Sequence, residues 1–354
     1  MKKLEPNLRL VAWEVTSACN LACKHCRAEA KPTPNKDELT NQEGKKLLES
    51  IAEVGKPIVI FTGGEPLMRE DIFDLISYAK SLGLKPVLSP NGTLITGEIA
   101  KKIKECGIRR ISISIDGPDA KSHNEFRGVD GAFEKIIEAI SYIKENNIEF
   151  QINTTITKSN LNSFKEIFNL VKELGAVAWH IFLLVPTGRA TEIQDQIISA
   201  EEYEKVLNWF YDFRKIAKNI HLKATCAPHY YRILRQRAKE EGIKVNFENF
   251  GLDAVSRGCL GGIGFCFVSN NGIVQPCGYL KLKCGNIREQ NFKTIWEDSP
   301  IFEKLRNPDC YKGKCSICEY FKVCGGCRAR AYTMLGDYLD EEPLCTYKPK
   351  RMKL

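Results

Sequence analysis

Residues 17–26 read SACNLACKHC and place three cysteines, Cys19, Cys23 and Cys26, in one short run. The irons of a [4Fe-4S] cluster normally take four cysteine thiolates. Because no other cysteine lies nearby, the triplet predicts a cluster with one iron open to a small molecule. Our candidate for that ligand is S-adenosylmethionine, through its amino and carboxylate groups. Zinc and buried free thiols are the alternatives, although zinc needs a fourth protein ligand and the histidine in this run has little reach.

The composition is that of a globular protein with unusual cysteine usage. The 354 residues are 43% hydrophobic and 27% charged, which fits one large domain with an appendage, or two domains. The first residues lack the apolar core of a signal peptide, and no apolar run is long enough to cross a membrane. We therefore expect a cytoplasmic protein with no membrane partner, whose 15 cysteines are reduced or bound to metal.

The net charge of +8 is spread along the chain, with no basic run interleaved with aromatic residues. This pattern gives no support to a nucleic-acid partner. Dispersed positive charge suits an anionic small molecule or an acidic electron donor, and it equally suits an ordinary solvated surface.

Short apolar runs alternate with helical patterns through the first half of the chain, which predicts an α/β fold with a parallel sheet. The expected strands are Leu10–Trp13, Pro57–Phe61, Lys85–Ser89, Arg110–Ile115, Phe150–Thr155 and Trp179–Leu184. The expected helices are Asn41–Val54, Asp71–Leu82, Glu98–Cys106, Ala132–Asn146 and Asn162–Leu174. Six such units are too few for a complete eight-unit barrel.

Two motifs follow the first two predicted strands. The cysteine triplet follows the first, and Gly63-Gly64-Glu65-Pro66 follows the second, so both are expected at the edge where α/β barrels build active sites. The glycines have a plain interpretation, a turn that needs positive φ. Beside a cluster loop, bare backbone also lets a ligand approach closely, and Glu65 or a carbonyl can accept from an ammonium group.

The pattern changes in the last third of the chain. Amphipathic helices are expected at Ala200–Lys218 and His229–Glu241, and beyond Leu252 helical periodicity gives way to glycine, cysteine and turn residues. Asn270-Asn271-Gly272 between two apolar runs predicts a hairpin. With a boundary near Asp253, we expect three parts: 1–199, 200–253 and 254–354.

The motif CxxxCxxC followed by GGEP resembles the radical S-adenosylmethionine (SAM) superfamily over about residues 8 to 190. The resemblance implies a partial (βα)6 barrel of the TIM type. It also implies that the open iron chelates the methionyl part of the cofactor, and that one electron cleaves it to a 5′-deoxyadenosyl radical that takes a hydrogen atom from substrate. By position in that core, the residues expected along the cofactor's ribose and adenine are Asn91, Ser114, Asp116, Asn153, Leu184 and Val185.

A second cysteine field is similar to the SPASM or twitch extension of radical enzymes, which carries auxiliary clusters. A zinc ribbon is the alternative, but only five residues lie between Cys318 and Cys324, against roughly 12–20 between the cysteine pairs of a ribbon. One spacing departs from the usual pattern, since Cys324 and Cys327 have two residues between them where three are usual. The resemblance implies one or two auxiliary [4Fe-4S] clusters, one held by Cys259, Cys266, Cys277 and Cys327, and another by Cys315, Cys318, Cys324 and Cys345. It leaves Cys284 and Cys310 without a role.

The run KATCAPHYYR at residues 223–232 gathers basic, aromatic and sulfur side chains between the barrel and the cysteine field. Its plain interpretation is a helix start with Pro228 in the first turn. Its position at a predicted domain interface equally fits a ligand pocket. A histidine or cysteine there could ligate a haem iron, and lysine or arginine could bind carboxylates.

Together with LRLVAWEVTSACN, FQINTTIT, HIFLLVPTGR, CGGCRARA and EEPLC, this run resembles the tetrapyrrole-modifying radical enzymes, and within them the haem b synthase family. The resemblance implies oxidative decarboxylation of two propionates of iron-coproporphyrin III to vinyl groups. Each propionate would consume one S-adenosylmethionine, and an external one-electron donor such as ferredoxin or flavodoxin would be needed. The candidates for holding this iron-porphyrin substrate are His25, Arg127, Arg189, Lys223, His229, Tyr231 and Arg232. Among them, His229 is a candidate axial ligand, and Arg127 has the alternative of serving the cofactor.

Three other functions stay open at this point. One is a sister reaction, the removal of acetate carboxylates from sirohaem or the maturation of haem d1. Another is a peptide-modifying SPASM enzyme, for which we would expect a peptide-binding domain ahead of the first strand, where only about eight residues stand. The third is a non-catalytic binding or electron-transfer module.

Overall fold

The computed structural model describes residues 3–217 and 219–352. Its described strands form one sheet in the order β10-β9-β8-β1-β2-β3-β4-β5-β6-β7. The strands are β1 Leu10–Glu14, β2 Ile58–Thr62, β3 Lys85–Leu88, β4 Arg110–Ser114, β5 Glu149–Ile156, β6 Ala178–Leu183, β7 His221–Thr225, β8 Phe265–Val268, β9 Ile273–Gln275 and β10 Gly285–Asn286.

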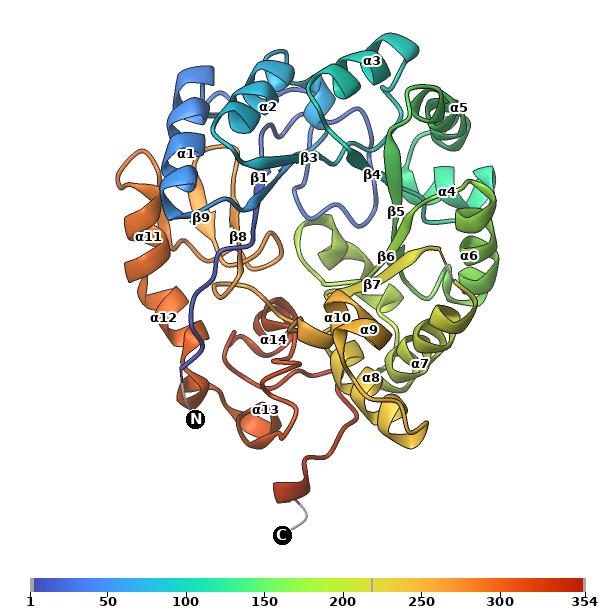
Figure 1. Cartoon of the computed structure of the whole chain (residues 1–354), viewed down its shortest axis with the longest axis vertical. Helices are drawn as coiled ribbons and strands as arrows, with labels where there is room; N and C mark the ends of the chain where they lie inside the picture. Colours follow the sequence, from blue (N-terminus) through green and yellow to red (C-terminus); the bar gives the residue numbers. More distant parts are fainter. Residues whose placement is uncertain (1–2, 218, 353–354) are drawn as a thin grey trace.

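Strands β1 to β7 run parallel and curve into an open ring, with helices on its outside (Figure 1). The six predicted strands are confirmed, and the sequence analysis missed a seventh. Strand β7 pairs with β6, with Trp179 opposite Leu222 and His180 opposite Lys223. Its residues HLKAT alternate in burial, but the run is short and was interpreted as part of a ligand-binding segment.

The helices follow the strands in the predicted alternation. They are α1 Asn41–Val54, α2 Ile72–Ser81, α3 Gly97–Glu105, α4 Ala120–Arg127, α5 Ala132–Glu145, α6 Phe164–Glu173, α7 Ala200–Ile216, α8 His229–Glu240, α9 Phe247–Phe250, α10 Leu252–Val255, α11 Phe292–Asp298, α12 Pro300–Arg306, α13 Gly313–Ile317 and α14 Arg328–Leu335. Capping boxes at Thr40–Glu43 and Ser199–Glu202 start α1 and α7, because each pair satisfies backbone donors that a helix start leaves free. The predicted end of α7, Lys218, lies outside the described residues.

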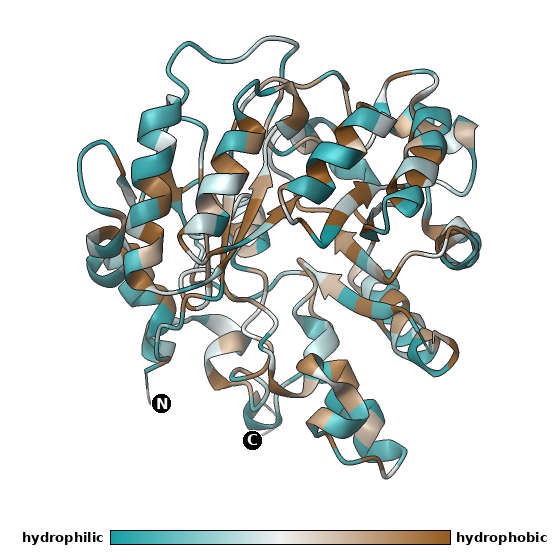
Figure 2. Ribbon diagram, turned by 45° about the horizontal axis from the view of Figure 1, so that its top comes forward, coloured by the Kyte–Doolittle hydropathy of each residue, from teal (hydrophilic) through white to brown (hydrophobic). Residues whose placement is uncertain are grey.

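The two faces of the ring differ in polarity, because successive strand residues point to opposite sides. The outer face packs apolar side chains such as Trp13, Ile113 and Trp179 against the helices, and all three are fully buried. Figure 2 shows the corresponding hydrophobic strands covered by helices whose outer sides are hydrophilic. The inner face carries polar residues that stay partly exposed, among them Asn153 and Lys223. The inner face of the ring is therefore polar, and its outer face is apolar and covered by helices.

The C-terminal third joins the same sheet. Strand β8 pairs in parallel with β1, and β8 and β9 form the predicted hairpin around Gly272. In Figure 1 this segment lies between the two ends of the ring, beside β1 on one side and α8 on the other. Strands from both sides of Asp253 in the sequence thus belong to one sheet. The division of the chain into three parts stays a prediction. No helix within the described ranges is long and apolar enough to cross a membrane.

Candidate active site

The loop after β1 carries the cysteine triplet, and polar donors surround its sulfur atoms. The backbone N–H of Leu21 donates to Cys19 Sγ at 3.4 Å, and the Asn91 side chain lies 3.9 Å from the same atom. Burial raises the pKa of the Cys19 thiol to about 11. Cys19 and Cys23 are buried and Cys26 is half-buried, and three closely spaced thiols are the donor set expected of soft-metal ligands. The site therefore fits an iron–sulfur cluster bound through Cys19, Cys23 and Cys26.

The GGEP motif packs directly on the cysteine loop. A Cβ atom on Gly64 would lie 2.2 Å from the carbonyl oxygen of Ala18, while the backbone N–H of Glu65 donates to that oxygen at 2.6 Å. Neither Gly63 nor Gly64 is among the described glycines in the left-handed φ region. The glycines are needed for close backbone approach, and the turn interpretation based on positive φ is not supported.

Glu65 is fully buried and lies between two loops. Its carboxylate accepts from the backbone N–H of Leu67 at 3.0 Å and of Asn91 at 2.6 Å. Burial raises its pKa to about 7, against the opposing effect of these two donors. Pro66 follows in a short 3-10 turn. The Glu65 side chain thus fastens the loop after β2 to the loop after β3, and its oxygens are occupied by backbone donors.

A buried ion pair supports the cysteine loop from the other side. Arg127 at the end of α4 pairs with Asp116 and lies 3.7 Å from Cys23 Sγ. Asp116 also accepts from the backbone N–H of Thr155 at 2.6 Å, which links the ends of β4 and β5. These contacts place Arg127 at the cluster loop, and its alternative role of serving the cofactor stays a prediction.

His25 lies within the cluster loop, and Arg189, which follows β6, contacts that loop. The Arg189 guanidinium donates to the carbonyl oxygens of Cys23 and Ala30, each at 2.9 Å. The His25 ring stacks on Phe126 at 4.4 Å. Burial, followed by the charges of Arg127 and Arg189, holds the pKa of His25 well below its usual value. His25 is therefore a neutral imidazole of the cysteine loop, packed on Phe126.

Other predicted cofactor residues lie along the inner rim. Ser114 and Asn153 pair across β4 and β5 and are partly exposed. Leu184 and Val185 follow β6 and are buried. The structure thus brings the polar and apolar candidates to the same edge of the ring as the cysteine triplet.

Four cysteines of the C-terminal field line one small cavity: Cys315, Cys318, Cys324 and Cys345. The His229 and Arg232 side chains line the same cavity. Burial lowers the pKa of His229 to about 4, and neither ring nitrogen has a hydrogen-bond partner. We name these four residues the outer cysteine set. The position of His229 beside them gives no support to its predicted role as a porphyrin ligand.

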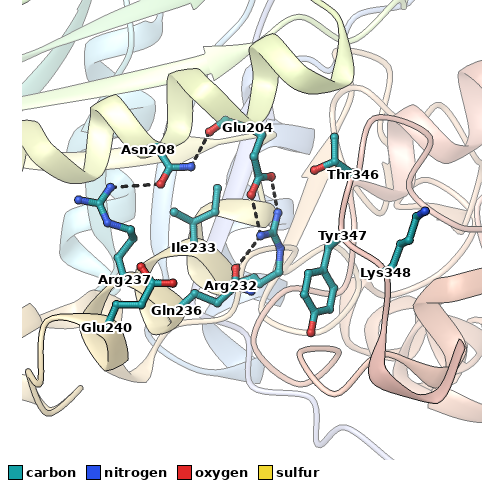
Figure 3. A pocket seen from close by; sticks show the side chains of 10 residues that line it. All are labelled: Glu204, Asn208, Arg232, Ile233, Gln236, Arg237, Glu240, Thr346, Tyr347 and Lys348. Carbon is teal, nitrogen blue, oxygen red and sulfur yellow. Dashed lines mark hydrogen bonds and ion pairs between the residues drawn. The ribbon is translucent and has the colours of Figure 1, made fainter. Parts of the chain in front are cut away.

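Arg232 and Tyr231 are engaged within the protein. Arg232 donates to both carboxylate oxygens of Glu204. Figure 3 shows this pair in the wall of a neighbouring cavity of about 450 Å³ that Tyr347 also lines. Tyr231 is buried and directs its hydroxyl toward Asp253 at 3.5 Å. The Asp253 carboxylate that faces the Tyr231 hydroxyl is also a charge neighbour of Lys223.

A second group contains three of the four cysteines predicted for the other auxiliary cluster. Cys277 and Cys327 belong to one apolar cluster with Val185 and Leu280, and the charge of a Cys259 thiolate raises the pKa of both after burial has done so. Cys266 is not among them. It pairs with Val11 in the sheet and lies in the main core, where its charge neighbours are Cys284 and Arg306. The predicted ligand set is therefore incomplete in the structure.

Within the described ranges, no three histidine, cysteine or carboxylate side chains converge as ligands of one metal ion. A structural zinc site needs four ligands around one ion. The match of residues 259–328 to an iron–sulfur cluster-binding domain, and not this absence, favours iron–sulfur clusters over a zinc ribbon.

Comparison with known proteins agrees with both cysteine fields. Residues 13–171 match the radical SAM superfamily, and residues 259–328 match the SPASM iron–sulfur cluster-binding domain. An AdoMet-dependent heme synthase of Oleidesulfovibrio alaskensis is 63% identical over 346 residues, which cover 98% of this chain and 89% of the relative. One of Methanosarcina barkeri is 53% identical and covers 96% and 97%. The chain belongs to the AdoMet-dependent heme synthase family.

Two further comparisons are with more distant proteins. The Fe-coproporphyrin III synthase of Methanosarcina barkeri is 32% identical to this chain, over 95% of the chain and 87% of the relative. The crystal structure of Streptococcus suis SuiB bound to S-adenosylmethionine superposes with a TM-score of 0.76 and 18% identity, over 97% of this chain and 78% of SuiB. This second likeness shows the fold alone. As a radical SAM and SPASM protein, this heme synthase family member binds a [4Fe-4S] cluster with S-adenosylmethionine and carries auxiliary iron–sulfur clusters.

Several residues of this heme synthase family member were missed by the site prediction. Arg330 and Glu342 form a fully buried ion pair at 3.2 Å between the barrel and the C-terminal segment. The backbone N–H of Tyr279 donates to Cys277 Sγ at 3.5 Å, and burial, followed by the charges of Cys226, Cys277 and Cys26, raises the pKa of its hydroxyl. Arg330 and Glu342 lie in the runs CGGCRARA and EEPLC, but a pair twelve residues apart has no signature spacing outside a helix.

Proposed function

We propose that the protein catalyses oxidative decarboxylation of two propionates of iron-coproporphyrin III to vinyl groups, giving haem b. The observation that carries the proposal is identity of 63% and 53% to AdoMet-dependent heme synthases over nearly the whole chain. The cysteine triplet, the polar ring interior and the cysteine-rich segment beside it supply the parts that this reaction needs.

Each propionate side chain becomes a vinyl group by losing one hydrogen atom, one electron and CO2. When bound, S-adenosylmethionine and its reduced cluster supply a 5′-deoxyadenosyl radical as the hydrogen-atom acceptor, and an auxiliary cluster supplies a one-electron acceptor. The residues of the chain hold these parts in place. We assign Cys19, Cys23 and Cys26 to the first cluster, and Asn91, Arg127 and Arg189 to the support of its loop.

We assign propionate binding to the inner face of the ring. Lys223 lies opposite His180 in adjacent strands, and both are partly exposed. Burial lowers the pKa of Lys223, and it also lowers that of His180, with the charges of Lys223, His221 and Arg110 acting in the same direction. Basic side chains that repel one another in a confined interior bind a carboxylate favourably. Of the predicted substrate residues, Lys223 is the one that we retain for this role.

The second candidate is the removal of acetate carboxylates that precedes iron-coproporphyrin III, supported by the 32% identity to an Fe-coproporphyrin III synthase. Anaerobically reconstituted protein with dithionite and S-adenosylmethionine should be incubated with iron-coproporphyrin III, or with didecarboxysirohaem. Mass spectrometry should find loss of two formic-acid equivalents from the first substrate and no change in the second. The reverse pattern would favour the second candidate, and no change in either would refute both.

We also propose an external one-electron donor such as ferredoxin or flavodoxin. The net charge of +8 suits acidic proteins of this kind, because long-range attraction speeds their encounter with a basic partner. Replacing dithionite by reduced flavodoxin should sustain haem formation, at a rate that falls as salt is added. A rate that is independent of salt would contradict an electrostatic encounter.

A further inference from the structure

Cys226 lies directly after β7, outside the matched cluster-binding domain at residues 259–328. Its side chain packs against the apolar cluster that contains Val185 and Cys327, as does that of Cys277. Cys259 is tied to the same segment, because its backbone N–H donates to the Cys324 carbonyl oxygen at 3.1 Å, three residues before Cys327. Cys226, Cys277 and Cys327 thus meet at one apolar cluster, and Cys259 lies beside the segment that carries Cys327.

Cys266 points to the other side of the same sheet. It is the register partner of Val11, whose side chain packs with the outer helices in the main core. The neighbours of Cys266 in β8 are Phe265 and Phe267, and the Arg27 guanidinium lies over the Phe267 ring at 4.4 Å on the inner side. Since successive strand residues alternate between faces, Cys266 cannot reach the inner group without reversing the register of β8.

Hydrogen bonds to its backbone carbonyl oxygen fix the position of Cys226 beside the other three cysteines. The Cys226 carbonyl oxygen accepts from the Tyr203 hydroxyl at 2.9 Å and from Arg330 Nη2 at 3.0 Å. The partner of Arg330, Glu342, accepts from the backbone N–H of Cys327 at 2.7 Å. Cys226 itself has φ of +54°, a left-handed conformation that is costly for a residue with a side chain and is maintained where the surroundings fix it.

We infer that Cys226, Cys259, Cys277 and Cys327 hold an auxiliary [4Fe-4S] cluster, with Cys226 as the fourth ligand in place of Cys266. We name these residues the inner cysteine set. The barrel itself, through the end of β7, would then supply one ligand of an auxiliary cluster. The inference rests on the auxiliary clusters and is independent of which tetrapyrrole the enzyme uses.

The test compares Cys226→Ala with Cys266→Ala, each reconstituted anaerobically as the full chain, with Cys106→Ala on the outer surface as the control. Iron and sulfide counts and the EPR spectrum of the reduced protein are the readouts. We expect Cys266→Ala and Cys106→Ala to match wild type at about twelve irons, the content of three four-iron clusters. We expect Cys226→Ala to lose about four irons, or about one with the EPR signal of a three-iron cluster.

A double variant separates ligand loss from misfolding. Cys226→Ala combined with Cys259→Ala should lose no more than the four irons of one cluster, because both residues belong to that cluster. The Cys226→Ala protein should also still cleave S-adenosylmethionine, which reports on the first cluster. Iron loss in Cys266→Ala, or unchanged iron and EPR signals in Cys226→Ala, would overturn the inference. Unchanged clusters with an altered porphyrin absorption spectrum in Cys226→Ala would instead make Cys226 a ligand of the haem iron.

Discussion

Lys223 illustrates how a single residue can be chosen among several basic candidates. The sequence offered Arg127, Arg189, Lys223 and Arg232 as carboxylate binders. In the structure, Arg127 and Arg232 are engaged by Asp116 and Glu204, and Arg189 donates to backbone carbonyls. Lys223 is left on the inner face without an ion pair among the described residues, and Asp253 is its favourable charge neighbour.

Replacing Lys223 should therefore weaken substrate binding and leave radical generation intact. We expect Lys223→Met to raise the KM for iron-coproporphyrin III at least tenfold, since a charge-assisted hydrogen bond contributes about 1.5–3 kcal/mol. Lys223→Arg should restore most of the affinity. Steady-state kinetics provide the measurement, together with cleavage of S-adenosylmethionine without porphyrin, which should equal that of wild type. A loss of this uncoupled cleavage would place Lys223 at the cofactor instead.

Arg127 should behave in the opposite way. Removing one member of a buried ion pair costs about 3–5 kcal/mol, because the other charge is left unpaired. Arg127→Met should thus lower the iron content and the uncoupled cleavage of S-adenosylmethionine together. Arg127→Lys keeps the charge but loses the second donor, and we expect an intermediate effect. Normal uncoupled cleavage combined with a raised KM for porphyrin would return Arg127 to the substrate.

At the scale of elements, periodicity predicted the six βα units because each strand buries an apolar outer face. It also placed the cysteine triplet and GGEP at the same edge, since both follow parallel strands. Strand β7 and helix α4 were missed because both are short, and α4 has only two buried apolar or aromatic side chains, His123 and Phe126. Cys226 was predicted as a possible haem-iron ligand and not as a cluster ligand. It lies far in sequence from the cysteines that it meets, and no spacing rule connects it to them.

The packing of GGEP on the cysteine loop can be tested with one methyl group. Gly64→Ala would place Cβ 2.2 Å from the Ala18 carbonyl oxygen, so the two loops would have to separate. We expect at least a tenfold loss of S-adenosylmethionine cleavage and a lower iron content. Gly55→Ala at the end of α1 is the matched control, since its Cβ meets nothing within 4 Å. Equal activity of the two variants would show that the close approach is dispensable.

At the scale of the whole molecule, Arg330 and Glu342 connect the barrel to the cysteine-rich segment. Arg330 donates to the carbonyl oxygens of Leu183 and Leu184 at the end of β6, at 3.3 and 3.4 Å, and to that of Cys226. The Glu342 carboxylate accepts from the backbone N–H of Cys327. The backbone N–H of Glu342 donates to Cys315 Sγ at 3.4 Å. One ion pair thus contacts the ring rim and both auxiliary cysteine sets.

Arg330→Met should loosen that connection. The unpaired Glu342 carboxylate would remain fully buried, at a cost of about 3–5 kcal/mol. We expect earlier cleavage between the barrel and the C-terminal segment in limited proteolysis, and a loss of auxiliary clusters that spares uncoupled S-adenosylmethionine cleavage. Lys312→Met removes an exposed ion pair with Asp337 and should change stability by less than about 1 kcal/mol. Identical proteolysis of the two variants would contradict a connecting role for Arg330.

The central claim is that a radical formed at the cysteine triplet removes a hydrogen atom from a propionate of iron-coproporphyrin III. The most direct measurement uses substrate deuterated at the propionate carbon next to the ring, and mass spectrometry of the 5′-deoxyadenosine released. We predict one deuterium in each 5′-deoxyadenosine and two 5′-deoxyadenosine molecules for each haem b formed. Haem b formation with 5′-deoxyadenosine free of deuterium would contradict the account.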